Sequence, residues 1–136
     1  MGVDLDSQDN NGSTTLIIAS KKSMADIIRL LLHNGANPKI KDNDGRTPLH
    51  YAAEGGCLEA VSILLDIGEK VDEMDSSGRT PSYFAAVNNK PAVIQLLAEH
   101  GTDFTLRDSN ELGIIHHAAL NTELYIMQFV VGTLRL

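Results

Sequence analysis

The chain has 136 residues, a formal net charge of −7 at pH 7 and 43% apolar residues, which fits one domain that can bury a core. The negative charge disfavours a nucleic-acid backbone as a partner, and no segment approaches the roughly 18 apolar residues of a membrane span. The first residues do not show the basic and apolar pattern of a secretory signal, so we expect an intracellular protein, cytoplasmic or nuclear.

Four sets of residues recur every 33 positions along nearly the whole chain. A period shared by several residue types indicates copies of one supersecondary unit, and such units stack into extended surfaces that usually bind other molecules. We expect the tail of a preceding copy over 1–8, full copies over 9–41, 42–74 and 75–107, and a divergent or truncated copy over 108–136. The sets are Gly2, Gly35, Gly68 and Gly101; Gly12, Gly45 and Gly78; Asp9, Asp42, Asp75 and Asp108; and Ala19, Ala52, Ala85 and Ala118.

The copy over 9–41 shows the unit in outline. It has turn and capping residues at Gly12 and Thr14, then Leu16 and Ala19, and later an apolar run over 27–32. This order predicts a turn, a short helix and a second helix.

The copy over 42–74 shows the unit most clearly. The turn formers over 42–46 precede Thr47, a good helix N-cap, and Pro48, which suits the first helical position. Gly55 and Gly56 should end this helix after about two turns. A second helix should place one apolar face inward and end before Gly68, where a left-handed C-terminal cap is expected. The apolar positions of that face are Leu58, Val61, Leu64 and Leu65.

The last two copies depart from this pattern to different degrees. The copy over 75–107 keeps the sequence Gly-Arg-Thr-Pro over 78–81, with Ser82 and Tyr83 at the next two positions. In the copy over 108–136, Glu111 replaces the turn glycine and Gly113 replaces the capping threonine. Because glycine offers no side-chain cap, we expect the last copy to be the least stable whole repeat.

These residues resemble the ankyrin repeat, whose Thr-Pro-Leu-His pattern followed by two alanines is present at 47–53 apart from Tyr51. The resemblance covers nearly the whole chain. It implies an all-α fold, an ankyrin-like helix-turn-helix solenoid with hairpin loops between repeats.

The two ends of the chain do not look like the terminal repeats of an array. The last expected helix, over 125–131, has little polar surface, whereas terminal repeats normally carry a polar outer face. We interpret the chain as a piece of a longer array; the alternative is a short protein with atypical caps. Ile126, Phe129 and Val130 should pack against Ile94 and Leu97. The side chains expected to lack cover, and to promote self-association, are Met127, Val131, Leu134 and Leu136.

No catalytic, cofactor or metal site is predicted. His116 and His117 are adjacent, so on a helix their side chains point about 100° apart and do not easily share a metal, and zinc-ligand spacing is missing. Cys57, the single cysteine, cannot form an internal disulfide, and no third orienting group accompanies it and His50. We therefore expect the chain not to be an enzyme.

The resemblance also implies where a partner binds. In ankyrin-like proteins the hairpin tips and the end of the first helix line the concave side. The tips supply Lys41, Asn43, Asp44, Arg46, Met74, Ser76, Ser77, Arg79, Arg107, Ser109, Asn110 and Leu112; the first-helix positions supply Lys21, Lys22, Glu54, Gly55, Val87, Asn88, Leu120 and Asn121. Arg46, Arg79 and Met74 are favoured, because Arg and Met are enriched at interfaces. Replacing both arginines with Glu is expected to weaken an acidic partner and to leave melting nearly unchanged.

The sequence thus predicts a protein–protein interaction module that binds a partner protein or peptide. The alternative is a regulatory or substrate-recruiting ankyrin arm of a larger multidomain enzyme or channel.

Overall fold

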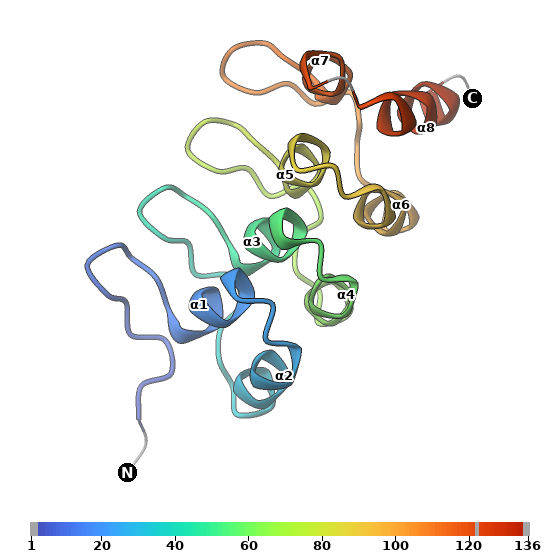
Figure 1. Cartoon of the computed structure of the whole chain (residues 1–136). Coiled ribbons are helices and arrows are strands. Elements are labelled where there is room, and N and C mark those ends of the chain that lie inside the picture. The colour runs from blue at the N-terminus through green and yellow to red at the C-terminus, as the bar shows by residue number, and fades with distance from the viewer. Residues whose placement is uncertain (1–2, 122, 135–136) are drawn as a thin grey trace.

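The computed structural model describes residues 3–121 and 123–134, which form helix pairs stacked along one axis (Figure 1). Loops project from one side of the stack, and the second helices lie on the other side. The described residues contain no strand, only an isolated antiparallel bridge between Arg107 and Gly113. This architecture confirms the predicted all-α helix-turn-helix solenoid. The first helices are α1 (Thr15–Lys21), α3 (Pro48–Gly55), α5 (Pro81–Val87) and α7 (Ile114–Leu120); the second helices are α2 (Ala25–His33), α4 (Leu58–Asp66), α6 (Pro91–Glu99) and α8 (Leu124–Leu134).

The first helices begin at residues with extended backbone, as the capping pattern predicts. The Thr14 hydroxyl accepts a hydrogen bond from the Ile17 N–H at 3.2 Å, and the Thr80 hydroxyl accepts one from the Tyr83 N–H at 3.4 Å. Each bond satisfies one of the amides that a helix start leaves without a partner. Gly113 has the same extended backbone at the start of α7 but provides no side-chain cap.

Histidines three residues into two of these helices add a cap that the sequence reading missed. His50 Nδ1 accepts a hydrogen bond from the Thr47 N–H at 3.0 Å, and His116 Nδ1 accepts one from the Gly113 N–H at 3.0 Å. The shared repeat position of the two histidines therefore has a structural reason, because each ring satisfies the amide of the residue that begins its helix.

The hairpin turns use a left-handed residue at one repeated position. Gly45 has φ +75°, and a Cβ atom there would lie 2.7 Å from the backbone nitrogen of Ser76 in the next hairpin. Glycine is thus required both by the backbone and by the stacking of hairpins. Glu111 takes the same position with φ +62°, and the described residues contain no further hairpin against it. Its side chain therefore has room, but the conformation costs on the order of 1 kcal/mol.

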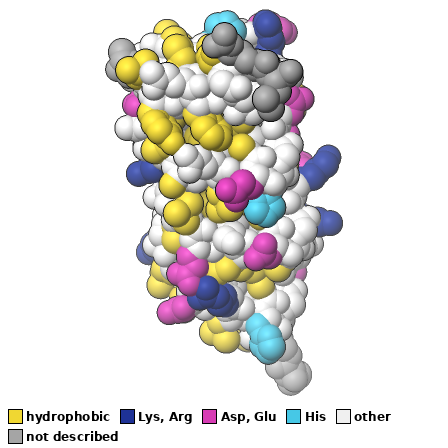
Figure 2. Space-filling view, turned by 90° about the vertical axis from the view of Figure 1, so that its right-hand side faces the viewer, with side chains coloured by type: hydrophobic (Ala, Val, Ile, Leu, Met, Phe, Trp, Pro, Cys, Tyr) yellow, Lys and Arg dark blue, Asp and Glu magenta, His cyan; other side chains and the backbone are white. Residues whose placement is uncertain are grey.

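The core is a continuous strip between the two rows of helices. It includes the four periodic alanines, which are at most 3% exposed and allow the first helices to approach closely. Val61, Leu64 and Leu65 point inward from α4, but Leu58 is 44% exposed. The prediction that Leu58 belongs to the buried face is therefore wrong: Leu58 is the first residue of α4, and its side chain, which leans toward the N-terminal end, extends beyond the helix. Figure 2 shows this outer side of the second helices, with hydrophobic side chains scattered along it.

The last helix, α8, is buried on one side only. Ile126 and Val130 are fully buried in the same cluster as Ile94 and Leu97, as predicted. Phe129 is half-buried, with its ring edge-on to Phe104 at 6.3 Å between centroids. Among the residues expected to lack cover, Leu134 is 41% exposed, whereas Met127 and Val131 are half-buried; Leu136 lies outside the described residues.

Candidate functional site

Each hairpin is closed by the carboxylate of the periodic aspartate. Asp75 Oδ1 accepts hydrogen bonds from the N–H groups of Ser77 and Arg79, both at 2.9 Å. Asp42 Oδ1 does the same for Asp44 and Arg46, at 2.9 and 3.0 Å. This local bonding explains why aspartate recurs at turns, and it leaves the second carboxylate oxygen for another partner.

The second oxygen finds a different donor in each of the last three repeats. The Tyr51 hydroxyl donates to Asp42 Oδ2, and burial raises the pKa of Tyr51, which keeps this donor protonated. His117 Nε2 lies 2.9 Å from Asp108 Oδ2. Tyr51 and His117 occupy the same repeat position, where the intervening repeat has Phe84. Because phenylalanine has no polar atom, Asp75 requires partners from elsewhere.

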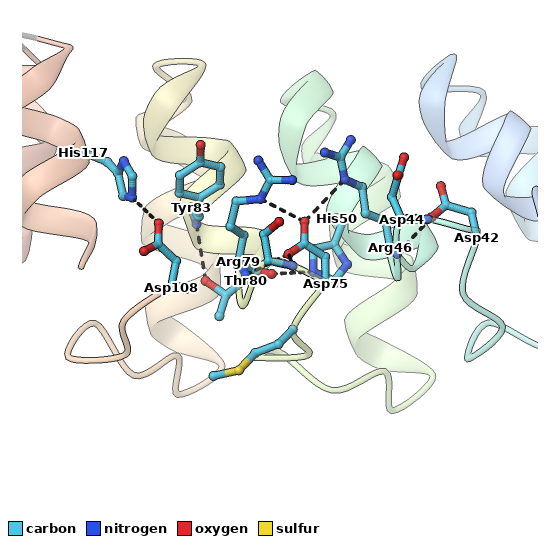
Figure 3. A network of polar contacts seen from close by, with 12 residues as sticks. Asp42, Asp44, Arg46, His50, Asp75, Arg79, Thr80, Tyr83, Asp108 and His117 are labelled. Atoms are coloured by element: carbon cyan, nitrogen blue, oxygen red, sulfur yellow. Dashed lines mark hydrogen bonds and ion pairs between the residues drawn. The ribbon is translucent and has the colours of Figure 1, made fainter. Parts of the chain in front are cut away.

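Two arginines from neighbouring hairpins supply those partners. The Asp75 side chain is fully buried, and its Oδ2 lies 3.0 Å from Arg79 Nε and 3.5 Å from Arg46 Nε. Figure 3 shows both guanidinium groups extending past Asp75 toward the same side. Two positive charges therefore surround one buried negative charge.

Aromatic rings hold the guanidinium groups from below. The Cζ atoms of Arg46 and Arg79 lie 4.7 and 5.3 Å from the centre of the Phe84 ring, and Arg79 Cζ also lies 5.4 Å from the Tyr83 ring. Arginine stacks well on aromatic faces because of its planar, weakly hydrated cation. The two side chains keep 21% and 27% of their surface exposed. Arg79 is thus hydrogen-bonded and Arg46 ion-paired to Asp75, and both side chains stay partly exposed.

A buried histidine connects the third hairpin to α3. His50 Nδ1 accepts from a backbone amide, so Nε2 carries the proton and donates to the Arg79 carbonyl at 3.0 Å. Burial lowers the pKa of His50 to about 4 because it disfavours the charged form. The neutral ring therefore fixes the backbone of Arg79.

Backbone hydrogen bonds join each hairpin tip to the next. Asn43 N–H donates to the Asn11 carbonyl at 3.0 Å, and Ser76 N–H donates to the Asp44 carbonyl at 3.0 Å. Ser109 N–H repeats this bond to the preceding hairpin. The tips form a ladder that satisfies these amides, and the side chains between the rungs remain exposed.

Comparison with protein families agrees with this geometry. A family model described as ankyrin repeats (3 copies) matches residues 1–75, which is more than half of the chain. The chain is an ankyrin-repeat protein. No curated protein matches it. Ankyrin repeats are generally non-enzymatic protein–protein interaction modules.

Most of the predicted contact residues lie on one side of this ankyrin array, which we call the hairpin face: the hairpins together with α1, α3, α5 and α7. Lys41 is held to the following repeat, with Nζ 2.7 Å from Glu73 and 3.1 Å from the Met74 carbonyl. Exposed are Lys21, Lys22, Lys41, Asn43, Asp44, Gly55, Met74, Ser76, Ser77, Asn88, Arg107, Ser109, Asn110, Leu120 and Asn121; half-buried are Arg46, Glu54, Arg79, Val87 and Leu112.

The structure corrects one premise about Arg46 and Arg79. Their replacement by Glu was expected to leave melting nearly unchanged, which requires side chains without structural contacts. Both in fact pair with the buried Asp75. A double reversal would place two carboxylates against a buried carboxylate, and such uncompensated buried charge is strongly destabilising.

Sequence reasoning missed the residues that support this face. Asp75, Phe84 and His117 were not among the predicted contact residues, yet the first two position the two arginines and His117 pairs with Asp108 of the last hairpin. The sequence did contain a signal for this arrangement. Tyr51, Phe84 and His117 stand at the same repeat position, 33 residues apart. Because Phe84 has no hydrogen-bond donor, the aspartate of its repeat, Asp75, receives none from the first helix at that position.

The described residues contain no group of three His, Cys, Asp or Glu side chains placed to hold a metal ion. Within the same residues, no helix has the length and apolar character to cross a membrane. His117 is engaged with Asp108, and His116 caps α7.

Proposed function

We propose that this protein binds a partner protein or peptide through the hairpin face, which is the concave side in ankyrin-like proteins. One observation supports this most: Arg46 and Arg79 both pair with the buried Asp75, lie over the Phe84 ring and are still partly exposed. Pre-organised side chains lose little conformational freedom on binding, and arginine is enriched among the residues that dominate interface energies.

The hairpin ladder supports the same face. Since the amides of Asn43, Ser76 and Ser109 bond to the preceding hairpin, the tip side chains project from a supported backbone. On the same face they offer Asn43, Met74 and Ser76, all exposed. This mixture of amide, thioether and hydroxyl groups suits a peptide that presents polar and small apolar side chains.

A displayed library of random peptides tests the proposal. Peptides selected on the full chain should lose binding when Asn43 and Ser76 are replaced by Arg, which adds bulk at the tips. The matched control replaces Ser62 and Gln95 by Arg on the opposite side, on α4 and α6, and should leave binding unchanged. Peptides that lose binding only in the control pair would contradict the proposal.

A substrate-recruiting or regulatory arm of a larger enzyme or channel would use the same face, and this alternative stays a prediction. An intracellular setting and a preference for protein over nucleic acid are part of the proposal. The net charge of −7 supports that preference.

A further inference from the structure

We propose that Arg46 and Arg79, held by Asp75, form a subsite for a single anionic group of the bound partner, a carboxylate or a phosphate. This inference rests on the proposed function and names the chemistry that the hairpin face would recognise. We call these three residues the arginine cluster.

The hydrogen-bonding arrangement of the arginine cluster leaves its outer ends for a ligand. Asp75 Oδ2 accepts a hydrogen bond from Arg79 Nε at 3.0 Å, and it lies 3.5 Å from Arg46 Nε, which pairs with it by charge without a hydrogen bond. For Arg79, no terminal amino group has a hydrogen bond within the described part of the chain, while Arg46 also contacts the Tyr51 hydroxyl. Terminal guanidinium nitrogens form the planar fork that carboxylates and phosphates fit.

The charges around the arginine cluster are unevenly screened. Two guanidinium groups face the one buried carboxylate of Asp75, and exposed Asp44 acts electrostatically on Arg46. Asp75 is fully buried and already accepts two backbone amides with its other oxygen, so it is satisfied. Solvent screens exposed Asp44, so an anion in direct contact with the guanidinium groups would interact with them more strongly than Asp44 does.

The surroundings limit the size of the anion. The Phe84 ring lies under both guanidinium groups and occupies that side of the cluster. Exposed Asp44 acts electrostatically on Arg46 and would repel further negative charges on that side. One anionic side chain within a peptide fits this pattern better than a long acidic run.

Nuclear magnetic resonance on the unmodified chain gives the direct test. The probes are three Gly-Ser peptides that differ at the central residue: phosphoserine, glutamate or serine. Both anionic peptides should shift the Nε–Hε signals of Arg46 and Arg79 in a saturable way, and the serine peptide should not. If only one anionic peptide does so, the subsite is assigned to phosphate or to carboxylate. No shift of these signals with either anionic peptide would overturn the proposal.

Matched variants distinguish specific hydrogen bonding by the planar guanidinium group from a general effect of net charge. Arg79→Gln should weaken the anionic peptide about tenfold, the size typical of one charged hydrogen bond. Arg79→Lys keeps the charge but loses the fork and should weaken it by a smaller factor. Arg29→Gln changes the net charge equally on α2, where Arg29 contacts Asp26 and Glu59, and should have no effect. Equal weakening by Arg29→Gln would overturn the proposal.

Two further measurements separate a failure of the anion subsite from misfolding of a variant or failure of the proposed function. Circular dichroism shows whether each variant is folded, and the signal shifts of the unmodified chain need no variant. A library peptide without any acidic or phosphorylated residue that binds the hairpin face and shifts both arginine signals would refute the anion subsite while the proposed function stands. Peptides that bind only the α4 and α6 side would refute both.

Discussion

Glu69 is a carboxylate buried in the second repeat, and its removal should stabilise the protein at high pH. It stands where the first repeat has Ala36 and the third has Thr102, and it is 6% exposed. Oε1 accepts from the Leu49 N–H at 3.3 Å. Oε2 has no hydrogen-bond partner among the described residues. Burial raises the pKa of Glu69 to about 7, from its ordinary 4.5, because it disfavours the charged form.

The raised pKa fixes the sign of the pH dependence. Between pH 4.5 and about 7 the unfolded chain ionises at Glu69 while the folded protein stays neutral there, so ionisation favours unfolding. The contribution of Glu69 to stability is therefore fully present below pH 4.5 and is lost as the pH rises through about 7. The difference in pKa corresponds to on the order of 3 kcal/mol.

The substitution Glu69→Gln isolates this effect, because Gln keeps an acceptor for Leu49 and cannot ionise. At about pH 8 it should raise the free energy of unfolding by up to about 3 kcal/mol, and at about pH 4 the difference should vanish. Urea titrations followed by circular dichroism across this range measure it. Asp66→Asn, an exposed residue of α4 with the same charge change, is the control. A gain that does not depend on pH would refute the reasoning.

Three further predictions concern stability and association. His50 acts in the opposite sense: its pKa is lowered to about 4 from 6.5, so its contribution is present above pH 6.5 and lost as the pH falls. His50→Gln should flatten the acid limb of the stability curve, and the exposed His33→Gln should not. In the last repeat, α7 and α8 should exchange amide hydrogens faster than α3 and α4, and Gly113→Thr should add about 0.5 to 1 kcal/mol. A Cβ at Gly113 would meet its neighbours no closer than 3.5 Å, so a loss of stability would refute this. Sedimentation should show self-association that Val131→Lys with Leu134→Lys abolishes; a strictly monomeric parent at high concentration would contradict it.

The helices, caps and turns could be predicted from the sequence because local rules set them. Thr14 and Thr80 cap helices through bonds to residues three positions away, and the left-handed turn at Gly45 is a property of that turn. Because the sequence repeats every 33 residues, a helix, cap or turn predicted in one copy is also predicted at the equivalent positions of the other copies.

The support of the candidate site could not be predicted in the same way, because it depends on contacts between repeats. That Asp75 draws Arg46 from the preceding hairpin follows from the stacking of two repeats and from the missing hydroxyl at Phe84. The exposure of Leu58 could not be predicted from helical periodicity either. Its apolar side chain fits the helical pattern, yet its position at the start of α4 exposes it.

The central claim is that a partner occupies the hairpin face. The most direct measurement is a map of backbone amide signals for the full chain with a library-selected peptide bound. We expect the shifts to concentrate in residues 42–46, 75–79 and the C-terminal ends of α3 and α5, with α4 and α6 nearly unchanged on their outer sides. Shifts confined to α4 and α6, with the two hairpins unaffected, would contradict it.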